Sequence, residues 1–108
     1  MRTYPILKDD GSLRGFEIRA QLTVFPLLRL LRSVDGVSDV RHNWSNADRI
    51  SFTFHGRPAV VHEPWGDSSR YWIGLQHPDS APDIDITPIH EAFKHYRGFL
   101  VTILWPLG

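Results

Sequence analysis

The densest group of reactive side chains lies between Glu63 and Tyr71, where the chain runs Glu-Pro-Trp-Gly-Asp-Ser-Ser-Arg-Tyr. This composition, rich in Gly, Asp, Pro and Ser, is typical of a loop that joins two strands. A carboxylate in a partly buried loop acts as a general base when burial raises its pKa. One hypothesis is therefore a small enzyme without a cofactor, whose pocket contains Glu63, Arg70, Tyr71 and His42.

The same loop has a structural interpretation, which the residue pattern favours. Asp67 would cap the loop through its backbone amides, while Arg70 would pair with Glu63 or Asp67 and hold the turn in place. Catalysis is therefore the alternative hypothesis, and we expect that the protein is not an enzyme.

Neither the histidines nor the paired aspartates predict a metal site. The chain has no cysteine, and its six histidines lack the compact spacing of zinc ligands. His90 and His95 are five residues apart and so lie on different sides of a helix, which predicts two surface residues. Asp83 and Asp85 precede a predicted helix, where acidic residues favour the positive end of the helix dipole. We predict no metal ion and no cofactor.

A second candidate site lies on the polar face of the predicted sheet. Large apolar side chains in a contiguous surface patch mark an interface, and this face carries a tryptophan and a valine. We expect a second copy of the chain, a partner protein, a ligand or the C-terminal segment to cover the patch. Its members are Arg41, Thr53, Val60, His62 and Trp72.

Both candidate sites depend on a predicted three-stranded meander. Apolar and polar residues alternate from Ile50 to His55 and again from Pro58 to Glu63, which is the period-two pattern of half-buried strands. Gly56–Arg57 is the predicted two-residue turn, because glycine tolerates the positive φ of tight hairpins. This turn would place Phe52 opposite Val61.

The third strand of the meander begins at Tyr71, after the polar loop. A register that sets Val61 opposite Ile73 keeps the apolar face continuous across the strands. The same register places Trp72 beside His62 on the polar face.

A hairpin and a helix are predicted ahead of the meander. Asp10–Gly11 is a strong turn signal within Thr3–Arg19, and Pro5 indicates an edge strand because it cannot donate a ladder hydrogen bond. Apolar residues at three- and four-residue steps over Val24–Val34 predict an amphipathic helix. Asp35–Gly36 is expected to end this helix, because glycine readily adopts the left-handed conformation.

The remaining elements are a strand and a second helix. Burial of the apolar residues in Val37–Trp44 predicts a strand that also turns His42 inward. Thr87 is the predicted N-cap of the second helix, with Pro88 at its first position. Residues 99–105 continue the helical pattern but are also prone to form a strand, and both alternatives are open.

Composition limits the class of protein. A chain of 108 residues with 42% hydrophobic residues forms one core, so we predict a single domain over residues 1–108. Twelve basic and twelve acidic residues give a net charge of zero, which disfavours nucleic acid as a partner. The first residues do not have the pattern of a signal peptide, and no apolar run is long enough to span a bilayer. We expect a cytoplasmic protein that does not enter membranes.

These elements predict an α+β fold with a single antiparallel sheet. The sheet combines an N-terminal hairpin with a four-stranded meander, and two helices pack on one of its faces. The leading hypothesis is a small non-catalytic binding or interaction protein, and specifically a homodimer. It would use the open face of the sheet and the loop over residues 63–72.

Overall fold

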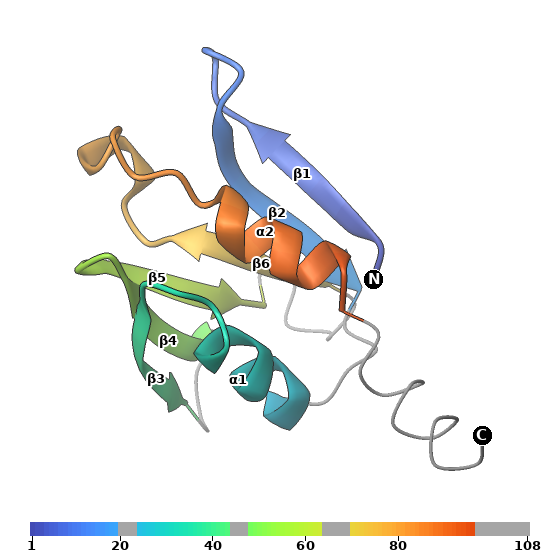
Figure 1. Ribbon diagram of the computed structural model, residues 1–108. Coiled ribbons are helices and arrows are strands. Elements are labelled where there is room, and N and C mark those ends of the chain that lie inside the picture. The colour runs from blue at the N-terminus through green and yellow to red at the C-terminus, as the bar shows by residue number, and fades with distance from the viewer. Residues whose placement is uncertain (20–23, 44–47, 64–69, 97–108) are drawn as a thin grey trace.

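A single antiparallel sheet with two helices on one face makes up the fold (Figure 1). The computed structural model describes residues 1–19, 24–43, 48–63 and 70–96. The helices are α1 (Val24–Arg32) and α2 (Thr87–Lys94), with a short 3-10 helix η1 (Pro78–Ser80). The strands are β1 (Thr3–Leu7), β2 (Leu13–Arg19), β3 (Val37–His42), β4 (Asp48–Phe54), β5 (Arg57–His62) and β6 (Arg70–Leu75).

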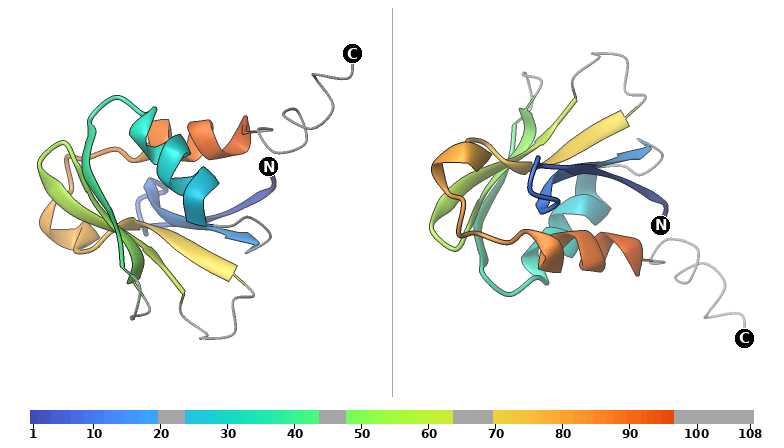
Figure 2. Two further views of the ribbon diagram at one scale, coloured as in Figure 1. Left: turned by 90° about the horizontal axis from the view of Figure 1, so that it is seen from below. Right: turned by 90° about the horizontal axis from the view of Figure 1, so that it is seen from above.

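The strands are arranged in the order β1-β2-β6-β5-β4-β3, and all neighbours are antiparallel. β1 and β2 form the predicted N-terminal hairpin, and β3 to β6 form the predicted meander. Both helices lie on the same side of the sheet (Figure 2). The predicted fold class is therefore confirmed, and β1 lies at an edge as Pro5 indicated. No helix in the described ranges is long and apolar enough to cross a membrane.

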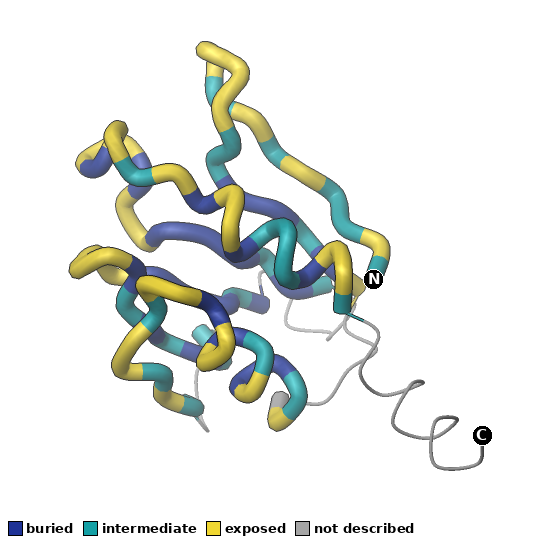
Figure 3. Tube along the Cα trace, in the orientation of Figure 1, coloured by how far each residue is buried: buried dark blue, intermediate teal, exposed yellow. Residues whose placement is uncertain are grey.

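The hydrophobic core lies between the sheet and the two helices. The rings of Phe16 on β2 and Phe93 on α2 meet edge to face, with centroids 5.2 Å apart. Leu27 and Leu31 of α1 are fully buried, as the helical pattern predicted. Figure 3 shows buried residues along the inner strands and exposed residues at the tip of the β1–β2 hairpin. Every second residue of the inner strands therefore faces the helices.

The turn between β4 and β5 is one residue earlier than predicted. His55 and Gly56 occupy its two central positions, with φ of 48° and 80°. Type I′ hairpin turns need positive φ at both central residues. The chain meets this need with glycine at the second central position rather than at the first. Phe52 therefore pairs with Ala59 instead of Val61. The displacement is two residues, so each side chain keeps its predicted face.

The registers around β6 agree with the prediction. Val61 pairs with Ile73, and His62 pairs with Trp72. β6 also pairs with β2, which the sequence pattern had not predicted. This pairing places residues of the N-terminal hairpin next to Trp72.

Local irregularities adjust the sheet at β3 and β4. The β3–β4 register shifts between Ser38 and Arg41, and Asp39 has a φ of 52°. This bulge lets both Val37 and Val40 pack against the core, although they are three positions apart in the strand. His42 pairs with Ile50 and lies on the helix-covered face, as predicted. The predicted extension of β3 to residue 44 is outside the described residues, as are residues 99–105.

The start of α2 differs from the prediction. Ile86 occupies the N-cap position and makes no side-chain capping bond. The Thr87 hydroxyl instead donates to Asp85 Oδ1 at 2.6 Å, and the Thr87 backbone N–H donates to the same atom at 2.9 Å. These two bonds lower the pKa of Asp85. The prediction that Thr87 caps the helix was wrong, because the nearby carboxylate takes both its hydroxyl and its amide.

Candidate functional site

The face of the sheet opposite the helices, called the open face below, carries a row of side chains that crosses five strands. Its centre is Trp72, whose neighbours along β6, Tyr71 and Ile73, point into the core. Because paired residues of a sheet project to the same side, the strand registers bring the members of the row together. In order across the sheet, the row is Tyr4, Glu17, Trp72, His62 and Asp48.

Two glycines let the indole of Trp72 lie against the backbone. Gly15 and Gly74 pair with each other across β2 and β6 and are buried. A Cβ atom at Gly15 would lie 2.6 Å from the Trp72 ring, and one at Gly74 would lie 2.7 Å from it. Real side chains do not approach so closely, so these positions need glycine. We call this surface the Gly15–Gly74 platform.

On one side of Trp72, the row contains Glu17 and Tyr4, and arginine side chains lie beside both of them. Glu17 Oε1 lies 3.1 Å from Arg70 Nη1. The Arg70 guanidinium also lies 4.1 Å from the centroid of the Tyr4 ring, which is a cation–π contact. Arg2 approaches the same ring, with its guanidinium carbon 5.6 Å from the centroid. Arg70 is therefore held in place by both an ion pair and an aromatic ring.

On the other side of Trp72, His62 interacts with Asp48. His62 Nδ1 lies 2.7 Å from Asp48 Oδ1, and both side chains are partly exposed. The β4–β5 register shifts between Asp48 and Ile50, so Arg49 is an extra residue in β4. This bulge turns Asp48 to the open face while Ile50 stays in the core.

The predicted patch residues separate into a centre and a periphery. Trp72, His62 and Val60 are neighbours on β5 and β6, but Val60 is only 7% exposed. The prediction that Val60 is exposed was wrong, because the Trp72 ring extends over Gly74, which pairs with Val60. Thr53 lies on β4, two residues beyond Ser51, which is the partner of Val60, and it is half-buried. Arg41 lies on edge strand β3 and pairs with Asp39 at 3.0 Å.

The predicted catalytic residues lie on two faces of the sheet. Glu63 is buried on the helix-covered side, with its Oε2 2.7 Å from Arg49 Nε. Tyr71 lies near it, since burial and then the Glu63 charge raise the pKa of Tyr71. Arg70 points to the open face, because adjacent residues of a strand alternate sides. His42 lies at β3 with its ring 6.1 Å from that of Phe25.

The predicted ion pair between Arg70 and Glu63 was therefore wrong, since each has a different partner. Asp67, the other predicted partner, is outside the described residues. Arg49, which forms the ion pair with Glu63, was not singled out in the sequence, because only the bulge in β4 brings it there. Across the described part of the chain, no three metal-ligating side chains are grouped closely enough to hold an ion.

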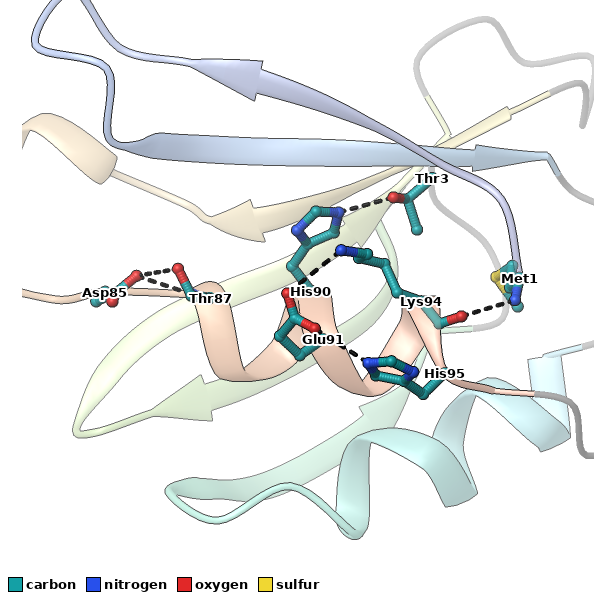
Figure 4. A network of polar contacts seen from close by, with 8 residues as sticks. All are labelled: Met1, Thr3, Asp85, Thr87, His90, Glu91, Lys94 and His95. Carbon is teal, nitrogen blue, oxygen red and sulfur yellow. Dashed lines mark hydrogen bonds and ion pairs between the residues drawn. The ribbon is translucent and has the colours of Figure 1, made fainter.

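A polar network connects the N-terminal strand to α2 (Figure 4). The His90 Nε2 atom lies 2.7 Å from the Thr3 hydroxyl, and the His90 ring packs 4.8 Å from that of Phe16. The Met1 nitrogen donates to the Lys94 carbonyl at the end of α2. His90 is half-buried rather than fully exposed as predicted, because its ring packs against Thr3 of β1 and Phe16 of β2. His95, by contrast, is exposed and contacts Glu91.

Acid should destabilise the fold through His90. Burial, followed by the Lys94 charge, lowers the pKa of His90 below its ordinary value of 6.5. Between the folded pKa and pH 6.5, the unfolded chain therefore binds more protons than the folded chain. The contribution of His90 to the free energy of unfolding is thus complete above pH 6.5 and is lost as the pH falls through the folded pKa. We expect His90→Gln to weaken the loss of stability between pH 7.5 and 5 in urea titrations. The control His95→Gln should keep it, and equal acid slopes for both variants would contradict the prediction.

Comparisons with known proteins found no related protein. The sequence matches no family model, and it has no detectable similarity to a curated protein or a solved structure.

Proposed function

We propose that this protein is a non-catalytic binding protein that associates with another protein chain through its open face. The observation that carries the proposal is the Trp72 indole on the Gly15–Gly74 platform. Both α1 and α2 pack on the opposite face, so no helix in the described ranges covers this indole. A large aromatic ring held rigidly on a surface loses little entropy on binding, and tryptophan is a common interface anchor.

The residues around Trp72 support a protein partner. Interfaces are enriched in tryptophan, tyrosine and arginine, and the row contains Tyr4 and Trp72 with Arg70 beside them. The charges on the row are of both signs and are largely paired, which does not favour a nucleic acid backbone. We propose a second copy of the chain as the partner and the cytoplasm as the location.

The alternative function is a cofactor-independent enzyme that uses Glu63 and Tyr71. The observation in its favour is a carboxylate buried close to a tyrosine whose pKa is raised by burial and then by that carboxylate. However, the Glu63 side chain is 1% exposed and is held by Arg49. A general base must reach its substrate within about 3 Å, and this burial opposes such access. Binding on the open face is therefore the stronger proposal.

Sedimentation at micromolar concentration tests the proposal. We expect the wild type to be a dimer and Trp72→Glu to be a folded monomer, because the change places like charges near each other in a desolvated interface. Phe25→Glu is the matched control, since Phe25 is 62% exposed on α1 and should leave the dimer intact. Circular dichroism reports the fold of each variant. A monomeric wild type would refute the second copy as partner, and dimers of Trp72→Glu would refute the open face.

A further inference from the structure

We infer that two copies dock face to face about a two-fold axis that runs along β6 through Trp72, so that Glu17 of each copy faces His62 of the other. The inference rests on the proposed function and specifies its interface. It follows from the order of charges along the row rather than from the apolar surface. On one side of Trp72 the open face carries the Glu17 carboxylate beside Arg70, and on the other side it carries the His62 imidazole beside Asp48.

Trp72 is the middle of the row. β2 and β5 are the strands on either side of β6, and β1 and β4 are the next ones out. Neighbouring strands are about 4.8 Å apart, so Glu17 and His62 lie at equal spacing on opposite sides of Trp72. Tyr4 and Asp48 are likewise two strands away on opposite sides.

A two-fold axis along β6 exchanges the two sides of the row. β2 of one copy then faces β5 of the other, and β1 faces β4. The Glu17 carboxylate meets His62, and Arg70, held over the Tyr4 ring, meets the side that carries Asp48. A symmetric interface must be complementary to itself, and this charge order satisfies that requirement.

The other face-to-face arrangement is less favourable. A two-fold axis along the row, across the strands, would place each residue of the row opposite its own copy. Glu17 would then face Glu17, and the Arg70 side of one copy would face the Arg70 side of the other. Juxtaposed like charges cost several kcal/mol in an interface and discriminate against wrong arrangements. The charges therefore select the axis along β6.

The shape of the face fits the same arrangement. The glycine platform lowers the surface under Trp72, so two indoles can meet at the axis between sheets that pack about 10 Å apart. β3 has no counterpart on the other side of β6 and extends beyond the paired strands. Arg41 on β3 would stay outside the interface, where it forms a local ion pair with Asp39.

A charge exchange tests the axis. His62→Glu places carboxylates opposite Glu17 of the other copy, and we expect the Kd to rise about a hundredfold or more. The double variant Glu17→Arg/His62→Glu places opposite charges across this axis and should return the Kd to within about tenfold of the wild type. His55→Glu, in the exposed β4–β5 turn, is the control and should not change the Kd. Failure of the double variant to recover, while folded, would overturn the inference.

Crosslinking gives an independent measurement that does not depend on the charge variants. The chain has no cysteine, so single thiols can be introduced at chosen positions. A mixture of Glu17→Cys and His62→Cys chains should form disulfide crosslinks under mild oxidation, because facing thiols come within reach of each other, whereas two strand spacings of about 4.8 Å separate the two Glu17 positions across the inferred axis. Crosslinks within the Glu17→Cys sample alone would instead support the axis across the strands and refute the inference. This outcome would leave the Trp72→Glu result, and with it the proposed function, intact.

Discussion

Phe52→Ala is expected to lower the free energy of unfolding by about 3–5 kcal/mol, the usual cost of truncating a buried phenylalanine. Phe52 lies in the middle of β4, is 3% exposed and belongs to the core between sheet and helices. Removal of its ring leaves a cavity that the surrounding strands cannot fill by collapse, because β4 is paired on both sides. A small domain typically has only about 5–15 kcal/mol of stability in total.

Thr53→Ala is the matched control for this prediction. Thr53 follows Phe52 in the same strand but projects to the open face, so its truncation should cost no more than about 1 kcal/mol. Urea denaturation followed by circular dichroism measures both variants. Equal losses at the two positions would show that the assignment of the helix-covered face is wrong.

The sequence was sufficient to predict the strands and their faces because burial imposes a period of two. Phe52 and Phe54 alternate with polar residues, and both are buried in the structure. The predicted β4–β5 turn was misplaced by one residue, which shifted the predicted partner of each β4 residue by two positions. A shift of two positions leaves every side chain on its predicted face. Facing Val61 with Ile73 was correct because only that choice keeps the apolar face continuous.

The row around Trp72 could be predicted only in part. Trp72 and His62 are adjacent through a local hairpin register, which the sequence encodes. Glu17 joins them only because β2 pairs with β6, and strands so far apart in the sequence have no local signal for pairing. The glycines at positions 15 and 74 are the exception, because a glycine inside a strand pattern indicates a bulge or close packing of another group.

The bulge in β4 explains why the sequence did not predict the ion pair between Arg49 and Glu63. The extra residue in β4 reverses the alternation there, so Asp48 faces outward and Arg49 reaches Glu63. A period-two pattern cannot show such an insertion before the partner strand is known. Arg70 was assigned to Glu63 or Asp67 because these residues flank one loop, although the Arg70 side chain projects to the face opposite Glu63.

Arg49→Met is expected to destabilise the fold strongly at pH 7. The variant removes the Arg49 guanidinium from the Glu63 carboxylate, whose side chain is 1% exposed. A buried carboxylate that loses its counter-ion costs several kcal/mol, because water cannot replace the lost interaction. Arg41→Met is the matched control, since it breaks the exposed ion pair with Asp39 on β3, outside the proposed interface. Thermal unfolding should show a much smaller effect for the control.

A double variant and a pH series determine whether the buried charge causes this loss. Arg49→Met/Glu63→Leu should recover most of the stability, because apolar residues of similar volume often replace a buried ion pair at little cost. In Arg49→Met alone, burial should raise the pKa of the folded carboxyl above its unfolded value of about 4.3. The folded state then binds more protons, so this variant should approach the wild type as pH falls from 7 to 5. A double variant no more stable than Arg49→Met would mean that Arg49 acts through packing rather than through its charge.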